Sequence, residues 1–449
     1  MNSKLEKYKN FCPVPWKQFA SSTDGYQRTC CSMSVLKEDL LSLGHKKDDL
    51  DQCTDLMDGF YIFDQGKQLR VSEGIEKYIN SDSTKNIKRM FSNNIAPHQC
   101  RCYVTEKIHN DSRRTTYLEK YNITSDEDVE KFIAKQNHDI DYYDIRLGNV
   151  CNLQCLMCYP GLSNQLYEQS LYQSSQESIR VESLEIRRVD GRIVFDKQLE
   201  KKIFDWANDD FFNDLEQKVV ADLSNNKDKI ITFYMIGGEP LLNAPHFRFL
   251  ERMVELGLSK NIELEYNTNL TVMTEEIVEL WSKFHKLTLA ISIDDTEDRY
   301  EYVRYPGKWS KILTNLGYVA EAISKHPKVF SIVNIVAVVN FFTAYNFSKL
   351  AAVGQQFGIN VSKLISTGPV YTTPTILTDE EKNDYAKLIP RDEHRLELIN
   401  YLNQFTFSED SRQQFFHMLK FWDSKRRKTF AQVFPELAEI LKISPAPAV

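Results

Sequence analysis

Cys151-Asn152-Leu153-Gln154-Cys155-Leu156-Met157-Cys158 places three cysteines within eight residues, spaced by three and then two residues. The preceding stretch, Tyr142-Tyr143-Asp144-Ile145-Arg146-Leu147, alternates in polarity and predicts a strand, so the cysteines follow on the loop that leaves it. Thiolates are soft ligands, and closely spaced cysteines are typical of iron–sulfur ligation. Structural zinc usually takes four ligands, supplied as two pairs. An iron–sulfur cluster and a zinc site both remain possible interpretations. The group of three cysteines favours a cluster in which one iron has no protein ligand.

The length and charge of the chain limit the classes of protein it can belong to. With 449 residues it is long enough for two or three domains, and 26 Phe and 22 Tyr supply a large core. The formal net charge is -7, which disfavours a nucleic-acid partner because phosphate contacts need a basic surface.

The sequence predicts a cytoplasmic protein with no membrane contact. No apolar run approaches the ~18 residues of a membrane span. The charged N-terminal stretch lacks the apolar centre of a signal peptide. In a reducing compartment the nine cysteines are expected to be metal ligands or free thiols rather than disulfides.

Strands and helices alternate from about residue 140 to 367. Repeated βα units predict a parallel sheet with right-handed crossovers. Continuous apolar runs such as 230–236 fit strands buried on both faces. Six units are too few for a closed eight-stranded barrel, so we expect an α/β fold with a partial (β/α)6 barrel. The expected strands are 142–148, 230–236, 261–267, 287–293, 329–338 and 361–366, and the expected helices are 245–257, 274–284, 309–324 and 345–356.

Three regions depart from this alternation. Residues 1–125 are turn-rich, with a hairpin expected at Ser22-Thr23-Asp24-Gly25 and a helix over 72–93. The expected barrel domain, 126–377, opens with a capped helix at 124–136 and carries an insertion at about 165–228. That insertion is expected to hold a hairpin at Asp190-Gly191 and a helical stretch over 198–223. Residues 378–449 predict a helical C-terminal region with helices at 379–389, 391–404, 409–424 and 428–442.

Gly237-Gly238-Glu239-Pro240 directly follows the second expected strand. Glycine lacks a Cβ, so backbone can approach a ligand closely there. Taken alone, the pair is better explained as a strand-to-helix turn.

The spacing Cys-x3-Cys-x2-Cys at the end of the first strand of a βα region resembles the radical S-adenosylmethionine (SAM) superfamily. The resemblance implies that Cys151, Cys155 and Cys158 hold a [4Fe–4S] cluster whose free iron binds the amino and carboxylate groups of SAM. It implies that an electron from the cluster cleaves SAM to methionine and a 5′-deoxyadenosyl radical, which takes a hydrogen atom from the substrate. Met157 stands where the family places a side chain against adenine, with Tyr159 as a second candidate for that contact.

Further positions match the family in order along the chain. Gly237, Gly238 and Glu239 resemble its Gly-Gly-Glu-Pro motif, which meets the SAM amino group. Where relatives carry Thr-Asn-Gly, this chain has Thr268-Asn269-Leu270, so we expect a different turn there. We expect Asn269 to lie at the SAM site, Ser292 and Asp294 to bind the ribose, and Arg304 to neutralise the SAM carboxylate. Asn340, which ends the fifth expected strand, should face the same end of the barrel. Alternatively, Ser292 and Asp294 cap a helix or turn, and Arg304 is a surface charge.

A second set of cysteines lies before the barrel. Together with Trp16, Asp24-Gly25, Tyr103, Glu106, Ser112 and Arg113, this set resembles the twitch or SPASM-like auxiliary-cluster module of radical SAM enzymes. The module usually follows the barrel, but it precedes it in a group of bacterial and phage proteins. The last pair is Cys-x1-Cys where Cys-x2-Cys is usual, so zinc ligands or free thiols are alternatives. The expected ligands are Cys12, Cys30 or Cys31, Cys100 and Cys102, and Cys53 is expected to be a plain thiol.

The resemblance implies a radical SAM enzyme acting on a peptide, protein side chain or small molecule, with an auxiliary [4Fe–4S] cluster. It also implies a reductant such as flavodoxin or ferredoxin. Modification of a nucleotide or RNA base is one alternative, and a zinc-binding interaction protein on a degenerate scaffold is another. No general base is assigned.

Overall fold

The computed structural model describes residues 5–30, 62–97, 100, 102, 106, 112–135 and 139–444. The chain divides into two compact units, Met1–Gly148 with Trp206–Met235, and Asn149–Asp205 with Ile236–Val449. The division into domains 1–125, 126–377 and 378–449 stays a prediction.

The first unit combines short strands with helices. Its strand order is β10-β5-β1-β2, with β1 parallel to β5 from Gln18 opposite Tyr142, and antiparallel to β2. A separate hairpin joins β3 and β4. Its elements are α1 (Val14–Lys17), β1 (Gln18–Ser21), β2 (Gln27–Arg28), β3 (Phe63–Asp64), β4 (Lys67–Gln68), η2 (Val71–Glu73), α4 (Ile75–Asn80), α5 (Asp82–Ser92), α7 (Arg113–Lys120), α8 (Asp126–Ala134), β5 (Tyr142–Arg146), α11 (Asp209–Asn225) and β10 (Ile231–Ile236).

The hairpin expected at Ser22–Gly25 is confirmed, because β1 and β2 pair across it. Gly25 has φ +79°, in the left-handed region that favours glycine. A Cβ on Gly25 would stand 2.7 Å from the ring of Trp206, whose Nε1 donates to the Thr23 carbonyl. The turn therefore requires glycine for its conformation and for its close packing.

The helical segment expected over 72–93 is present, but it is divided into α4 and α5. Ser81 has extended backbone, and its hydroxyl accepts a hydrogen bond from the Thr84 amide, so it ends α4 and caps α5. The apolar spacing continued across this point, but the preference of serine for the N-cap position outweighed it.

The second unit contains a run of parallel strands with the order β11-β12-β14-β15. The strands and helices expected in this region are present with ends shifted by a few residues. The core elements are η4 (Pro240–Leu242), α12 (Ala244–Glu255), η5 (Ser259–Asn261), β11 (Ile262–Thr268), α13 (Glu275–Ser282), β12 (Lys286–Ser292), α14 (Glu297–Val303), β13 (Arg304–Tyr305), α15 (Trp309–Lys325), β14 (Ile332–Val339), η6 (Ala344–Asn346), α16 (Phe347–Gln356), β15 (Asn360–Ile365), η7 (Val370–Thr372) and η8 (Pro374–Ile376).

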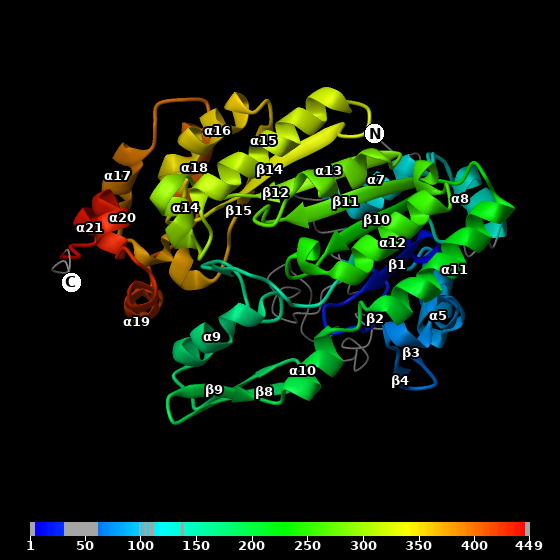
Figure 1. Ribbon diagram of the computed structural model, residues 1–449, viewed down its shortest axis with the longest axis horizontal. Helices are drawn as coiled ribbons and strands as arrows, with labels where there is room; N and C mark the ends of the chain where they lie inside the picture. The colour runs from blue at the N-terminus through cyan, green and yellow to red at the C-terminus, as the bar shows by residue number, and fades with distance from the viewer. Residues whose placement is uncertain are drawn as a thin grey trace. The chain divides into compact units, whose positions relative to one another are not determined.

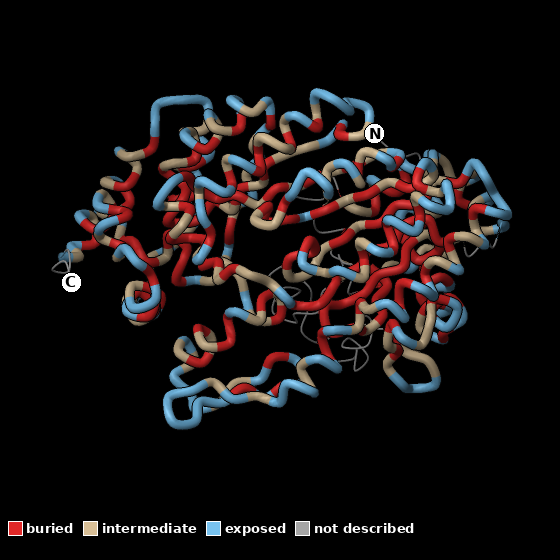
Figure 2. Tube along the Cα trace, in the orientation of Figure 1, coloured by how far each residue is buried: buried red, intermediate tan, exposed pale blue. Residues whose placement is uncertain are grey.

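Strands β11 and β12 each alternate buried and less buried residues, whereas β10 is buried along most of its length. Figure 2 shows the strands carrying much of the buried chain, with exposed residues concentrated on loops and outer helix faces. The fold is therefore α/β with mostly parallel pairing, as expected. Its curvature into a partial barrel stays a prediction.

The insertion forms a small antiparallel sheet, β7-β8-β9, packed on two helices (Figure 1). Asp190 and Gly191 both have positive φ and form the two-residue turn that joins β8 and β9, as expected. The helix expected over 198–223 is divided, because Asn208 caps α11 after a break that follows α10. The cysteine loop contributes β6 (Gln154–Cys155) and η3 (Asn164–Leu166). The insertion elements in this unit are α9 (Tyr167–Ser174), β7 (Ser178–Val181), β8 (Leu184–Val189), β9 (Arg192–Phe195) and α10 (Lys197–Phe204).

After η8, the described residues form five α-helices: α17 (Asp379–Leu388), α18 (Arg395–Asn403), α19 (Glu409–Lys425), α20 (Phe430–Val433) and α21 (Pro435–Ile440). The expected helix over 428–442 is interrupted at Phe434. Helix α19 packs on α9, where Trp422 Nε1 donates to Gln169 Oε1 at 3.1 Å and His417 stacks on Tyr172. Within the described part of the chain, no helix is long and apolar enough to cross a membrane.

Candidate functional site

The loop that carries the three cysteines is held by a short antiparallel pairing. Cys155 lies on β6, directly opposite Arg304 on β13. The Leu156 amide donates to the Val303 carbonyl at 3.0 Å, and the Cys158 amide donates to the Cys155 carbonyl at 3.1 Å. This pairing joins the cysteine loop to a segment far away in sequence.

Side chains anchor both ends of the same loop. Ser163 Oγ donates to the Leu153 carbonyl at 2.8 Å. Asn149 Nδ2 donates to the Pro160 carbonyl and, at 2.9 Å, to the hydroxyl of Tyr167 on α9. The backbone that presents the thiols is therefore fixed before any ligand binds.

The three thiols lie close enough to influence each other electrostatically. Burial raises the pKa of Cys155, while Arg304 opposes this rise and the other two cysteines add to it. Burial and Cys151 together raise the pKa of Cys158 to about 11. The pKa of Cys151 is also raised, mainly by burial. The positive irons of a cluster, each bound by one of the sulfurs, would stabilise all three thiolates.

The glycine pair packs directly on the cysteine loop. A Cβ on Gly238 would stand 2.1 Å from the Val150 carbonyl oxygen, which also accepts the Glu239 amide at 2.8 Å. Gly237 has φ +133°. Glycine is required here because the two backbones touch, which goes beyond a plain strand-to-helix turn.

The Glu239 carboxylate is buried and bound by protein donors. Its Oε1 accepts the Thr268 hydroxyl at 2.6 Å and the Leu241 amide at 3.1 Å, and its Oε2 accepts the Asn269 amide at 2.7 Å. Burial raises the pKa of Glu239 to about 7, although these hydrogen bonds lower it. Glu239 thus joins the loop after β10 to the loop after β11.

Asn269 links that second loop to the cysteines. Its Nδ2 lies 3.0 Å from Asn152 Oδ1 and 3.9 Å from Cys151 Sγ. Asn152 Nδ2 in turn donates to Thr271 Oγ1 at 2.8 Å. Asn152 and Thr271 are site residues that were not expected from the sequence, although an asparagine beside the first cysteine and a threonine two residues after Asn269 are typical loop-capping residues.

Leu270 takes the third position of this turn, where relatives carry glycine, and whether the turn differs from theirs stays a prediction. Leu270 has φ +64°, the left-handed conformation that glycine adopts most easily. Its side chain is fully buried, and its carbonyl accepts Asn315 Nδ2 at 2.6 Å. Burial of the leucine side chain compensates for a backbone conformation that leucine rarely adopts.

Arg304 is a buried residue, not a surface charge. Its Nε donates to Asp294 Oδ2 at 2.6 Å, and its Nη1 lies 3.8 Å from Cys155 Sγ. Asp294 also accepts the Val338 amide at 2.8 Å, so it joins β13 to β14. Burial lowers the pKa of Arg304, but the nearby Asp294 and Cys155 raise it above its ordinary value.

The other predicted contacts differ in exposure. Met157 is half-buried, while Tyr159 is 55% exposed and its ring lies beside Gly161. Ser292 ends β12 and is half-buried. Asn340 is buried, and its Nδ2 meets no hydrogen-bond partner among the residues described. Ser292 and Asn340 follow the carboxyl ends of neighbouring parallel strands, where such sheets bind ligands.

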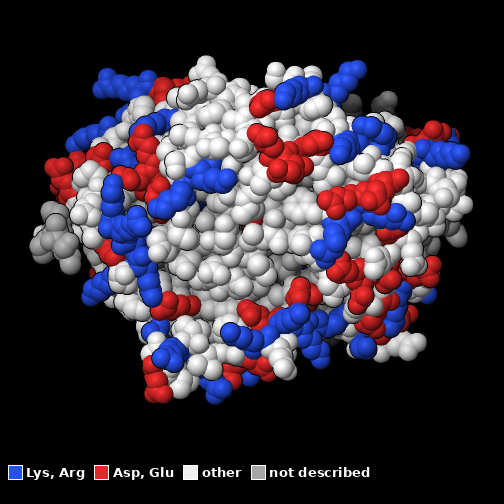
Figure 3. Space-filling model, viewed as in Figure 1, with Lys and Arg blue, Asp and Glu red and all other residues white. Residues whose placement is uncertain are grey.

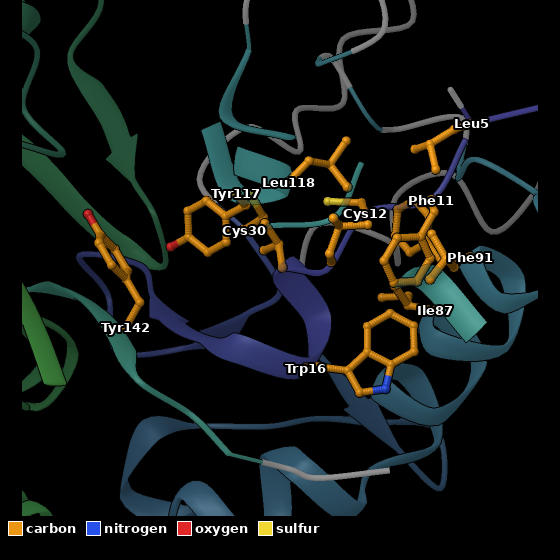
Figure 4. Close-up of a cluster of buried hydrophobic side chains, with 13 residues drawn as sticks. Leu5, Phe11, Cys12, Trp16, Cys30, Ile87, Phe91, Tyr117, Leu118 and Tyr142 are labelled. Carbon is orange, nitrogen blue, oxygen red and sulfur yellow. The ribbon is translucent and has the colours of Figure 1, made fainter. Parts of the chain in front are cut away.

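The earlier cysteines gather in the first unit. Figure 4 shows Cys12 and Cys30 among the aromatic and aliphatic side chains of a buried cluster that includes Trp16 and Tyr117. Burial and the neighbouring Cys102 raise the pKa of Cys12 to about 12, and burial, Cys12 and Cys102 raise that of Cys100. Cys31, Cys53 and Tyr103 lie outside the described residues.

A buried ion pair stands beside these cysteines. Arg114 binds both oxygens of Glu106, at 2.8 and 2.5 Å, and donates to the Phe11 carbonyl next to Cys12. The Ser112 hydroxyl also donates to Glu106, and Arg113 stacks on Tyr142. Glu106, Ser112 and Arg113 were expected here from the sequence, whereas Arg114 was not.

The donor set at Cys151, Cys155 and Cys158 fits an iron–sulfur cluster. Three soft thiols come from one braced loop, and an arginine and an asparagine approach two of the sulfurs. Among the residues that the structure describes, no three His, Cys, Asp or Glu side chains converge on a position for a single metal ion. The cysteine ligands of a four-iron cluster each bind a different iron and therefore stand further apart than the ligands of one ion.

Residues 145–339 match the family model of the radical SAM superfamily. The chain contains a radical SAM domain. Its first matched residue lies in β5 and its last ends β14, so the match includes the three cysteines, Gly237–Glu239 and Arg304. This match confirms the expected radical SAM domain, and the cofactors of that superfamily are a [4Fe–4S] cluster and SAM. No curated protein matches the sequence.

Solved structures similar to this chain include radical SAM proteins with bound AdoMet, which is SAM. Native anSMEcpe with bound AdoMet has 18% identity and a TM-score of 0.32, covering 54% of this chain and 60% of its own. SuiB of Streptococcus suis bound to S-adenosylmethionine has 16% identity and a TM-score of 0.34, covering 71% and 64%. SuiB bound to the precursor peptide SuiA has 13% identity and a TM-score of 0.33, covering 74% and 68%. This chain thus spans about 60% of the length of anSMEcpe.

Proposed function

We propose that this protein reductively cleaves SAM and abstracts a hydrogen atom from a peptide, protein or small-molecule substrate. The observation that carries the proposal is the braced loop of Cys151, Cys155 and Cys158, which lies inside the matched radical SAM domain. When bound, a [4Fe–4S] cluster and SAM supply one-electron cleavage to methionine and a 5′-deoxyadenosyl radical.

The chain's own residues would orient both cofactors and exclude water. The three thiols would hold the cluster, leaving one iron without a protein ligand. The backbone of Gly237 and Gly238 would line the SAM amino group, because Gly238 lies directly against the backbone of Val150, next to the first cysteine. Glu239 would accept a proton or hydrogen bond there at Oε2, which accepts one donor among the described residues, whereas Oε1 accepts two.

The remaining predicted contacts belong to the same proposal. Met157 and Tyr159 would flank the adenine, and Ser292 would bond the ribose. Asn269 supports this site because its amide binds Glu239 and its side chain approaches Cys151. Asn340, at the end of a neighbouring strand, offers a buried amide nitrogen that has no hydrogen-bond partner in the described part of the chain.

We also propose that Cys12, Cys100 and Cys102, with Cys30 or Cys31, hold an auxiliary iron–sulfur cluster. Support comes from the mutual effect of three of these thiols on their pKa values and from the buried Arg114–Glu106 pair beside them. When bound, such a cluster supplies a ligand for substrate or an electron acceptor. The chain's contribution would be burial and hydrogen bonds to sulfur, which set the potential.

A peptide or protein side chain is the preferred substrate class because enzymes with such auxiliary modules often modify peptides. Modification of RNA or a nucleotide is less favoured by the formal charge of -7. On the face drawn in Figure 3, Lys and Arg are interspersed with Asp and Glu rather than gathered into one basic field. A one-electron donor such as flavodoxin or ferredoxin would complete the reaction.

Anaerobic reconstitution with iron and sulfide tests this proposal. We expect brown protein with about eight irons per chain, an EPR signal after reduction, and formation of 5′-deoxyadenosine from SAM. Transfer of deuterium from labelled candidate peptides into 5′-deoxyadenosine would identify the substrate. Colourless protein that binds stoichiometric zinc and leaves SAM intact would refute the proposal.

Two matched variants separate the clusters. Cys155→Ala should lose about four irons and all SAM cleavage. Cys12→Ala should lose the auxiliary iron and keep the EPR signal that responds to SAM. Equal loss from both variants would contradict two separate sites.

A further inference from the structure

The buried guanidinium of Arg304 lies against a proposed cluster ligand. Arg304 is 6% exposed, and its Nη1 stands 3.8 Å from the Sγ of Cys155. The two residues also face each other across the β6–β13 pairing. A full positive charge is therefore fixed at hydrogen-bonding distance from this sulfur.

Asp294 determines the direction in which this guanidinium points. Its Oδ2 accepts Arg304 Nε at 2.6 Å, and its Oδ1 accepts the Val338 amide at 2.8 Å. Because the Asp294 side chain is fully buried and held at both oxygens, it cannot turn away. The Nε edge of Arg304 is thus occupied by protein, and the Nη1 end is directed to Cys155.

We propose that Arg304, positioned by Asp294, raises the reduction potential of the cluster held by Cys151, Cys155 and Cys158, and that it does not bind the SAM carboxylate. This inference rests on the function proposed above. It replaces the role that the family resemblance implied for Arg304 with one that the observed contacts support.

The physical reason is electrostatic. Reduction adds one electron to the cluster, supplied by a one-electron donor protein or dithionite. A nearby cation stabilises the more negative, reduced state, and a hydrogen bond to a ligand sulfur acts in the same direction. A nearby carboxylate opposes reduction. Arg304 and Asp294 therefore act with opposite signs, although one holds the other in place.

Because the two charges have opposite effects on the reduction potential, substitutions of Arg304 and Asp294 should shift it in opposite directions. A purely structural role would not produce such opposite shifts. Arg304→Gln should shift the potential of the SAM-free cluster to more negative values, because Asp294 remains as an unpaired buried charge. Asp294→Asn should shift it to more positive values. The double variant, which removes both charges, should lie between the two, and Arg304→Lys should lie nearer to wild type than Arg304→Gln does.

The measurement is an anaerobic redox titration of the reconstituted full-length protein, followed by EPR. Subtracting the signal of a variant with Cys151, Cys155 and Cys158 all changed to Ala isolates the cluster of interest from the auxiliary one. Arg412→Gln is the matched control, since it breaks another half-buried pair, with Glu381 at 2.7 Å, in the helical C-terminal region. Its potential should equal that of wild type.

The outcomes separate this inference from the proposed function. If wild type carries no cluster that the triple cysteine variant lacks, the proposed function fails and the inference fails with it. If the cluster forms and both single variants shift its potential in the same direction, or neither does, only the inference is overturned. A large loss of SAM affinity in Arg304→Gln with an unchanged potential would place Arg304 on the SAM carboxylate and overturn it too. If Arg304→Gln does not fold, Asp294→Asn and Arg304→Lys still show in which direction each charge shifts the reduction potential of the cluster.

Discussion

The α-carbon of Gly238 faces the carbonyl oxygen of Val150 so closely that a Cβ would stand 2.1 Å from that oxygen. The same oxygen accepts the Glu239 amide. The glycine pair and the cysteine loop therefore form one packed structure, and a side chain at Gly238 must displace backbone rather than a flexible side-chain end.

Gly238→Ala should destabilise the protein by about 1–3 kcal/mol, as expected for overpacking, and should lower iron occupancy at Cys151, Cys155 and Cys158. Thermal unfolding and iron analysis measure these effects. Gly317→Ala is the control, because a Cβ there meets nothing within 4 Å inside helix α15. That change should stabilise the protein by about 1 kcal/mol. Normal iron binding in Gly238→Ala would contradict the packing argument.

Glu239 should make the cluster-free protein less stable as pH rises. Its folded pKa of about 7 exceeds the ordinary value of 4.5, so its contribution to stability is fully present below pH 4.5 and is lost as pH rises through 7. Between pH 5 and 8 the Glu239→Gln variant should gain about 2 kcal/mol of unfolding free energy relative to wild type. Urea unfolding at both pH values measures the difference. Parallel pH profiles for the two proteins would show that Glu239 does not titrate in this range.

At Leu270, a glycine substitution should destabilise the protein less than an alanine substitution, which is the reverse of the usual order. Leu270→Ala removes a fully buried side chain and should cost about 2–5 kcal/mol. Leu270→Gly removes the same side chain but relieves a left-handed backbone conformation at φ +64°, which costs an alanine roughly 1–2 kcal/mol. The glycine variant should therefore unfold at the higher temperature. A lower Tm for Leu270→Gly would refute the assigned backbone conformation.

Arg114 should support the auxiliary site specifically. Lysine cannot reproduce a fork that binds both Glu106 oxygens and the Phe11 carbonyl, so Arg114→Lys should destabilise the protein by about 3 kcal/mol. We expect it to lose auxiliary iron while the SAM-responsive EPR signal remains. Arg89→Lys changes an exposed arginine and should behave like wild type. Loss of the SAM-responsive signal in Arg114→Lys would contradict the separation of the sites.

Local sequence determined the elements around the site more reliably than the contacts within it. The cysteine spacing, the glycine pair and the βα alternation are each encoded within a few neighbouring residues, so strand and loop positions were predicted closely. The helix breaks at Ser81, Asn208 and Phe434 were missed, because apolar spacing continued across them while caps and local turns ended the helices. The auxiliary ligand set and the domain boundaries remain predictions.

Only the tertiary structure decided how the predicted residues are used. Arg304 and Asp294 were assigned to SAM by resemblance, yet they bind each other and approach Cys155, which lies 149 positions from Arg304 in the chain. Glu239 was assigned to the SAM amino group, but it also joins two loops through Thr268 and Asn269. A sequence states which groups can donate, accept or carry charge. Which of them meet depends on strand order and burial, because a buried charge must find a partner wherever the fold places one.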